Sequence, residues 1–243
     1  MLYFIELSYR GTHYFGWQRQ PEQISVQEVI EDCLSKTNGN RPITIYGCGR
    51  TDTGVHAKHF VAHVEMQEIK NLDKYVYKLN RMLPADISIH RLYEVEPNQH
   101  ARFSAKSRTY RYYVHSIKDP FKEDLSWKLK KELNFAAMNE AAKHLIGTKD
   151  FTSLSKLHTS AKTNICTITK AEWIPFSETE AYFEISADRF LRNMVRATVG
   201  TLMEVGLDRI KPDEILGILA KKDRQEASTS VPAHGLYLWE IEY

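Results

Sequence analysis

The residues best suited to chemistry lie in Gly47–Ala57, which reads Gly-Cys-Gly-Arg-Thr-Asp-Thr-Gly-Val-His-Ala. Asp52 is the one carboxylate of this segment, and Arg50 stands two residues before it. A neighbouring arginine keeps a carboxylate ionised and oriented, which suits a nucleophile better than a general acid. The glycines around Asp52 allow positive φ angles and close approach of a ligand. The same residues also fit a surface turn with an Asx-type cap, so their spacing leaves both interpretations open.

Gly49–Ala57 resembles the signature of the bacterial tRNA pseudouridine synthases of the TruA type. Further blocks of that family occur in the same order along the chain: Tyr9–Gln18, His100–Ala105, Arg108–Tyr112, Phe190–Arg196 and Pro232–Leu238. The resemblance therefore covers nearly the whole chain. It implies an enzyme that isomerises uridine to pseudouridine at positions 38, 39 and 40 of tRNA, in the anticodon arm.

Composition is that of an ordinary globular protein. The chain has 243 residues, of which 42% are hydrophobic and 26% are charged. No apolar run approaches the length needed to cross a bilayer, and the N-terminus lacks the pattern of a signal peptide. Three widely spaced cysteines indicate neither a disulfide framework nor a CxxC zinc site. We therefore expect a reduced, cytoplasmic protein without a membrane partner.

Positive charge is concentrated in residues 102–131, although the formal net charge of the chain is only +2. This segment carries nine basic side chains against three acidic ones, enough for a patch that follows a phosphate backbone. Tyr110, Tyr112 and Tyr113 are interleaved with the basic residues, and RNA recognition combines aromatic stacking with basic contacts. A strand and loop whose charges face water, with the tyrosines in the core, would show the same pattern.

The hydrophobic pattern predicts an α+β protein built from two tandem ferredoxin-like (β-α-β-β-α-β) halves around a central cleft, residues 1–103 and 104–243. The resemblance implies the same two-lobed pseudouridine synthase fold, with the Asp52 loop in the first half and the stacking tyrosine and partner arginine in the second. In the first half, we expect strands at 2–9, 43–48, 58–66 and 87–95. A capping box, Ser25–Glu28, begins the first helix, and the second covers residues 72–83.

The second half is predicted to repeat this order. We expect strands at 108–117, 165–174, 180–187 and 236–243, a helix at 134–146, and a short helix that begins at Pro212. A longer helix is expected from Arg189 to Val205. In that helix, Arg189, Arg192 and Arg196 would share one face, because they stand at i, i+3 and i+7.

The resemblance assigns three catalytic residues. Asp52 is the essential carboxylate, acting as a nucleophile at C1′ of the ribose or as a base at C2′. Tyr110 stacks on the target base, and Arg196 is the cation that accompanies Asp52. Pseudouridine formation involves no net redox change, so neither a cofactor nor a metal is expected.

A larger set of residues is expected to bind tRNA. A uridine inside a stem must be flipped out to reach a carboxylate, and Arg50 would then hold its phosphate or fill the vacated space. Leu236 is expected to line the uracil pocket. The remaining expected contacts are Gln99, His100, Ala101, Arg102, Phe103, Lys118, Ser160, Ala161, Lys162, Thr163 and Asn164. The resemblance also implies a homodimer that shares one tRNA.

The sequence is open to three other interpretations. A zinc site on His56, His59 and His63 is unfavourable, because the four residues of strand between His59 and His63 span about 13 Å and zinc ligands lie about 2 Å from the ion. A non-catalytic protein with two RRM-like halves would explain the strand order and the tyrosines but would give the Asp52 loop no purpose. A nucleosidase or glycosidase would use a second carboxylate, and no family-like block contains one. Free uracil as a product would favour the nucleosidase.

Overall fold

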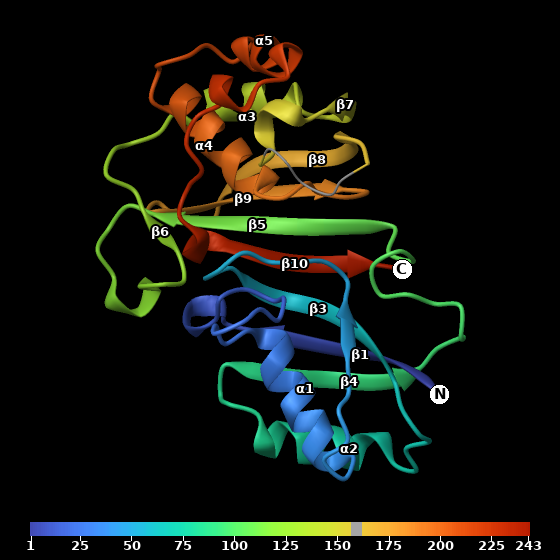
Figure 1. The fold of residues 1–243 in the computed structure, drawn as a ribbon. Helices are drawn as coiled ribbons and strands as arrows, with labels where there is room; N and C mark the ends of the chain where they lie inside the picture. Colours follow the sequence, from blue (N-terminus) through green and yellow to red (C-terminus); the bar gives the residue numbers. More distant parts are fainter. Residues whose placement is uncertain (157–161) are drawn as a thin grey trace. The chain divides into compact units, whose positions relative to one another are not determined.

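The computed structural model describes residues 1–156 and 162–243, and the chain divides into two compact units (Figure 1). Unit 1 comprises Met1–Lys106 and Tyr237–Tyr243, and unit 2 comprises Ser107–Leu236. The described residues mix strands with five α-helices, so the architecture is of the mixed α and β kind. The end of the chain belongs to unit 1 because its last strand, β10 (Leu236–Glu242), runs parallel to β3 (His56–Glu65) there.

Unit 1 follows the β-α-β-β-α-β order that its hydrophobic pattern predicts. The further elements are β1 (Leu2–Tyr9), the 3₁₀ turn η1 (Gly11–His13), α1 (Val26–Thr37), β2 (Ile45–Gly47), α2 (Leu72–Met82) and β4 (Ile87–Glu94). Strand β1 lies between β4 and β3 and is antiparallel to both, and β2 is antiparallel to β3. The predicted start of this helix at Ser25 is confirmed, because the Ser25 hydroxyl caps α1 by accepting a hydrogen bond from the Glu28 N–H.

The core of unit 1 lies on the face of the sheet where alternate residues of β1 and β3 are apolar. Ile5 pairs with Ala62, and Leu7 pairs with Phe60; all four are fully buried. Helices α1 and α2 add further buried side chains, and α2 packs against β4 (Figure 1). The alternation places the neighbouring residues of β1 and β3, such as Phe4 and His63, on the opposite face.

Unit 2 is built around an antiparallel arrangement of strands in the order β5-β9-β8-β7. Its elements are β5 (Ser107–His115), β6 (Trp127–Lys128), α3 (Phe135–Lys143), β7 (Gly147–Asp150), β8 (Ile165–Pro175), β9 (Glu180–Ala187), α4 (Met194–Gly206) and α5 (Glu214–Lys221), with short 3₁₀ turns between them. The sequence pattern did not predict β6 and β7. Strand β6 has only two residues, and Gly-Thr-Lys-Asp in β7 shows no apolar alternation.

Helix α4 begins at Met194, so the prediction of a helix from Arg189 is wrong. Asn193 precedes it with φ +65°, a left-handed conformation that interrupts a helical path. The Asp188 carboxylate accepts hydrogen bonds from the backbone N–H groups of Arg189 and Thr167, which fixes the chain in a non-helical form there. Arg189 and Arg192 consequently lie outside the helix that carries Arg196, and the expected three-arginine stripe does not exist.

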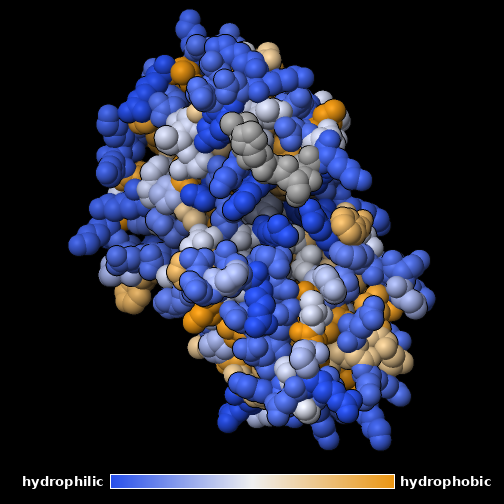
Figure 2. Space-filling model, viewed as in Figure 1, coloured by the Kyte–Doolittle hydropathy of each residue, from blue (hydrophilic) through white to orange (hydrophobic). Residues whose placement is uncertain are grey.

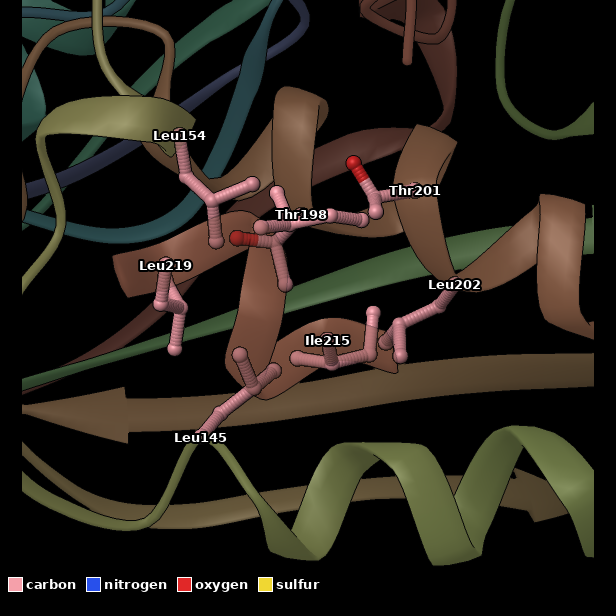
Figure 3. Close-up of a pocket in the computed structure, with 8 residues that line it drawn as sticks. Leu145, Leu154, Thr198, Thr201, Leu202, Ile215 and Leu219 are labelled. Atoms are coloured by element: carbon pink, nitrogen blue, oxygen red, sulfur yellow. The ribbon is translucent and has the colours of Figure 1, made fainter. Parts of the chain in front are cut away.

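Helix α4 is buried on almost every side. Figure 3 shows Thr198 and Thr201 of this helix among leucine and isoleucine side chains, which together leave no space for a water molecule. The hydroxyl groups of these threonines donate to the carbonyls of Met194 and Ala197, one turn earlier. These internal bonds satisfy the threonines and allow them to lie in an apolar core.

The surface is mostly polar, in contrast to the apolar core around α4. Figure 2 shows a mostly hydrophilic face on which apolar side chains are scattered rather than gathered into one patch. Within residues 1–156 and 162–243, none of the helices combines the length and apolar character needed to cross a bilayer.

Gly200 of α4 gives a stability prediction. A Cβ at Gly200 would lie 2.0 Å from the carbonyl oxygen of Thr229, whereas a Cβ at Gly217 of α5 would meet nothing within 4 Å. We expect Gly200→Ala to lower the free energy of unfolding by about 1–3 kcal/mol through overpacking. Gly217→Ala should raise it by up to about 1 kcal/mol, because alanine is the better helix former. Urea denaturation of both variants measures this, and equal effects would contradict the close approach at Gly200.

Candidate active site

Asp52 lies at a tight turn in the loop between β2 and β3. Its side chain is half-buried, and its backbone carbonyl accepts a hydrogen bond from the Val55 N–H at 3.1 Å. Gly54 adopts φ +77°, which a side chain would strain, so the glycine is needed for this turn. A backbone turn is therefore present at Asp52, and it is compatible with a chemical role for the carboxylate.

Thr51, the residue before Asp52, is held by three contacts with residues 9–17, which include the end of β1 and the segment after it. The hydroxyl of Thr51 shares a hydrogen bond of 2.8 Å with that of Tyr9, and its carbonyl accepts from the Trp17 N–H at 3.2 Å. Gly16 adopts φ +87°, and a Cβ there would lie 2.4 Å from the Thr51 carbonyl oxygen. The absence of a side chain at Gly16 is what lets the two backbones approach.

The residues after Asp52 have a second anchor on the same segment. His56 is completely buried, and its Nδ1 accepts a hydrogen bond from the Gly11 N–H at 3.0 Å. The His56 ring also packs against Tyr237 of β10, with ring centroids 4.6 Å apart. A Cβ at Gly11 would lie 2.0 Å from the Val55 carbonyl oxygen, so this approach also requires a glycine. Both ends of the Asp52 turn are thus fixed to residues 9–17.

Three packed aromatic rings support the contact between the Asp52 loop and residues 9–17. The buried Trp17 ring stacks on Phe60 at a centroid distance of 3.9 Å and an angle of 26°, and Tyr9 packs against both rings. A Cβ at Gly47, just before the loop, would lie 2.6 Å from the Trp17 indole nitrogen. Sequence reasoning missed Tyr9, Trp17 and His56 as the residues that hold the turn, although all three belong to the family-like blocks.

Arg50 is exposed at the entrance to this loop. Its Nε donates a hydrogen bond to Oε1 of Gln18 at 3.2 Å. The side chain is therefore oriented by the Tyr9–Gln18 block while much of its guanidinium faces solvent, a suitable position for a phosphate or base contact.

In unit 2, Tyr110 lies on β5 and is half-buried. Its ring meets Phe190 edge to face, with centroids 5.1 Å apart and an interplanar angle of 85°. Tyr112, two residues along the same strand, is fully buried and donates its hydroxyl to the Pro232 carbonyl at 2.9 Å. Burial raises the pKa of Tyr112. Tyr112 is therefore a core residue, one of the alternatives that the sequence left open, whereas Tyr110 retains partial exposure.

Arg196 lies in the first turn of α4 and is tied to the segment before the last strand. Its Nε donates to the Val231 carbonyl at 2.8 Å, and the Val231 N–H donates back to the Arg196 carbonyl at 3.3 Å. Leu236, at the start of β10, is almost completely buried. The block Phe190–Arg196 is therefore hydrogen-bonded to Val231, the residue just before the block Pro232–Leu238.

The loop that contains Gln99–Phe103 is anchored in unit 1 through Ala101. This residue is fully buried; its N–H donates to Nδ1 of His63 at 3.1 Å, and its carbonyl accepts from the Tyr243 hydroxyl at 2.7 Å. On either side of this anchor, His100 is half-buried and Arg102 is exposed. Burial and the neighbouring Arg102 charge lower the pKa of His100.

The other residues expected to bind RNA lie in unit 2. Lys118, Lys162 and Thr163 are exposed. Asn164 is half-buried and donates from Nδ2 to the Thr152 hydroxyl at 2.8 Å. Ser160 and Ala161 lie outside the described residues.

The histidines of β3 are engaged in structural hydrogen bonds. Nδ1 of His63 accepts from Ala101, and Nδ1 of His59 accepts from the Ile241 N–H at 3.3 Å. Burial and the neighbouring His100 lower the pKa of His63 to about 4. Among the residues that the structure describes, no three histidine, cysteine or acidic side chains are grouped to hold a metal ion.

Comparison with known proteins identifies the family. Residues 7–104 and 141–243 match the family model described as tRNA pseudouridine synthase. The chain is 48% identical over 242 residues to tRNA pseudouridine synthase A of Bacteroides fragilis, covering 99% of this chain and 96% of the relative. Identity is 50% to the protein of the same name from Parabacteroides distasonis (99% and 95% covered) and 38% to that from Bacillus subtilis (98% and 97% covered). The chain belongs to the tRNA pseudouridine synthase family, and it is an isomerase.

The contact between Gly16 and Thr51 predicts a loss of activity. Gly16→Ala would combine a positive φ with a clash against the Thr51 carbonyl, and we expect the displaced Asp52 turn to lower the rate of pseudouridine formation about 100-fold. Gly39 is the control, because it also has a positive φ (+65°) but a Cβ there would meet nothing within 4 Å. Gly39→Ala should cost about 1–2 kcal/mol of stability and leave the rate unchanged. Equal rates for the two folded variants would contradict the role of Gly16.

Proposed function

We propose that this protein isomerises uridine to pseudouridine at positions 38, 39 and 40 of the anticodon arm of tRNA, with Asp52 as the essential carboxylate. The observation that carries the proposal is the double anchoring of the Asp52 turn, through Thr51 on one side and His56 on the other. A turn anchored in this way holds the backbone of Asp52 in one position, and preorganisation of the group that acts on the substrate lowers a barrier.

The reaction requires a group that acts on the ribose while the base is detached and turned. The N1–C1′ bond breaks, a C5–C1′ bond forms, C5 loses its proton and N1 gains one, so the product is an isomer of the substrate. Asp52 would begin this sequence either by attacking C1′ or by removing the C2′ proton. Both routes need the carboxylate held close to the ribose, and neither requires a redox cofactor or a metal.

Tyr110 and Arg196 complete the proposed catalytic residues. Tyr110 would stack on the target base, since its ring is held edge-on by Phe190 and keeps partial exposure. Arg196 would supply the positive charge that accompanies Asp52, with its orientation set by the Val231 carbonyl. Leu236 would contact the detached uracil.

The proposal also includes the detailed arrangement of the fold. Two tandem ferredoxin-like halves around a central cleft, residues 1–103 and 104–243, would bring the carboxylate from the first half to a base held by the second. The β-α-β-β-α-β order of unit 1, with strands in the order β4-β1-β3-β2, supports this assignment for the first half.

The proposed partner is tRNA in the cytoplasm, bound by a homodimer. Arg50 would hold the backbone of the flipped nucleotide, and its exposed guanidinium supports that role. The remaining proposed contacts are Gln99, His100, Ala101, Arg102, Phe103, Lys118, Ser160, Ala161, Lys162, Thr163 and Asn164.

Asp52→Asn provides the first test of the proposal. The amide preserves the size of the side chain but removes the carboxylate, so we expect the variant to bind tRNA and form no pseudouridine. An unmodified tRNA transcript is incubated with purified protein, treated with carbodiimide and read by reverse transcription. Stops at 38, 39 or 40 with the wild type alone support the proposal.

Two outcomes would count against it. Tight binding by the wild type without any stops would favour a non-catalytic RNA-binding protein or another RNA substrate. Release of free uracil would instead indicate hydrolysis of the glycosidic bond.

Arg196 is tested by comparing Arg196→Ala with Arg196→Lys. We expect the alanine variant to lower the single-turnover rate about 100-fold or more, because a preorganised charge is lost from the site. It should also lose about 1 kcal/mol of stability, since the Val231 carbonyl loses its donor. Arg196→Lys keeps the charge and should recover part of the rate. A wild-type rate in a destabilised Arg196→Ala would show that Arg196 has only a structural role.

A further inference from the structure

A row of aromatic rings crosses the face of the unit 1 sheet that lies opposite the apolar core. The strand register pairs Tyr93 of β4 with Phe4 of β1, Phe4 with His63 of β3, and His63 with Tyr46 of β2. The ring centroids of these successive pairs are 6.0, 6.4 and 5.1 Å apart. Four residues from distant parts of the chain thus form one continuous row.

The row ends in exposed rings on the β2 side. Tyr46 is 55% exposed, yet its ring lies nearly parallel to the buried His63 ring, at an angle of 20°. His100 packs edge-on against His63 at 4.4 Å, and Phe103, which is 75% exposed, lies 4.4 Å from His100. The Arg102 guanidinium lies 5.6 Å from the centre of the Phe103 ring. This end of the row therefore presents two exposed aromatic surfaces beside a positive charge.

The rings are held in place before any ligand binds. His63 accepts from the Ala101 N–H, and Nδ1 of His100 accepts from the Arg102 N–H at 3.0 Å. The pKa of His63 near 4 keeps this ring neutral at physiological pH, so the hydrogen bond from Ala101 persists. A rigid aromatic surface loses little conformational entropy when a ligand stacks on it.

The Tyr93 end of the row lies beside acidic side chains. A groove of about 580 Å³ is lined by Phe4, Tyr93 and Tyr243 together with Glu94 and Glu96. Glu94 and Glu96 repel an RNA backbone, and the Arg91 guanidinium, 4.4 Å from the centre of the Tyr93 ring, is paired with Glu6. At the Tyr46 end, the guanidinium of Arg102 attracts an RNA backbone. Charge therefore favours the Tyr46 end for RNA.

We propose that Tyr46, His100 and Phe103 form a stacking platform for an unpaired base of the substrate tRNA, separate from the uridine that is isomerised. Proteins that bind unpaired RNA stack bases on exposed aromatic rings and contact the backbone through basic side chains. The inference rests on the proposed function and adds Tyr46 to the residues that bind the substrate. Tyr46 supplies the exposed flat ring, and the buried His63 fixes its orientation.

The test measures tRNA affinity in the Asp52→Asn background, so that binding is observed without turnover. Tyr46→Ala should weaken binding of an unmodified tRNA transcript about tenfold, which is within the range for the loss of one stacked base. Tyr46→Phe keeps the ring and should bind normally. The matched control is Tyr77→Ala, which removes a tyrosine that is 69% exposed on α2 of the same unit.

The outcomes of this experiment test the stacking platform separately from the formation of pseudouridine. Weaker binding by Tyr46→Ala alone, with an unchanged sedimentation coefficient and melting temperature, supports the platform. Affinity equal to that of Tyr77→Ala overturns it, even while the protein with native Asp52 still forms pseudouridine. Dissociation of an oligomer by Tyr46→Ala also overturns it, because the ring would then belong to an interface between copies of the chain.

Discussion

The close approach of two backbone segments, residues 11–17 and residues 51–56, is the constraint on which the candidate site depends. At Gly11 and Gly16, any side chain would collide with a carbonyl oxygen of the Asp52 loop. Where the segments meet, backbone N–H and carbonyl groups are removed from water and must find partners within the protein. Thr51, Gly54 and His56 provide those partners, so close approach and hydrogen bonding reinforce each other. The position of the Asp52 backbone follows from this contact more than from the loop sequence alone.

A comparable arrangement exists within unit 2. Arg196 and Val231 are far apart in the sequence, yet they exchange two hydrogen bonds. Tyr112 extends this contact by donating to Pro232, while Gly235 lies so close to the Tyr112 ring that a Cβ would be 2.8 Å from it. In unit 2, therefore, the Arg196 side chain is oriented by a backbone group just before a family-like block, while in unit 1 the backbone around Asp52 is held by residues 9–17.

The sequence predicted the parts of the fold that depend on local patterns. The Ser25 cap, the Asn134 cap of α3 and the β-α-β-β-α-β order of unit 1 are all present. The start of α4 was placed wrongly because apolar periodicity continues through Phe190 and Leu191. The helix is interrupted there by hydrogen bonds to Asp188 and by the left-handed conformation of Asn193. Neither feature produces a periodic pattern in the sequence. Strands β6 and β7 form because they pair with neighbouring strands. That pairing depends on the whole sheet and is not visible in a short stretch of sequence.

The candidate site shows the same division between local pattern and tertiary contact. Residue type and spacing pointed to Asp52, Arg50 and the surrounding glycines but left a plain surface turn open, and the resemblance to a known family assigned the catalytic role to Asp52. The roles of Tyr9, Trp17 and His56 could not be inferred in this way, since they depend on which strand lies beside which. The row from Tyr93 to Tyr46 is the strongest case, because a shift of one residue in any strand pairing would send one of its rings to the other face. Strand register is decided by burial of the apolar face, so the core of unit 1 also determines which aromatic rings gather on the side away from it.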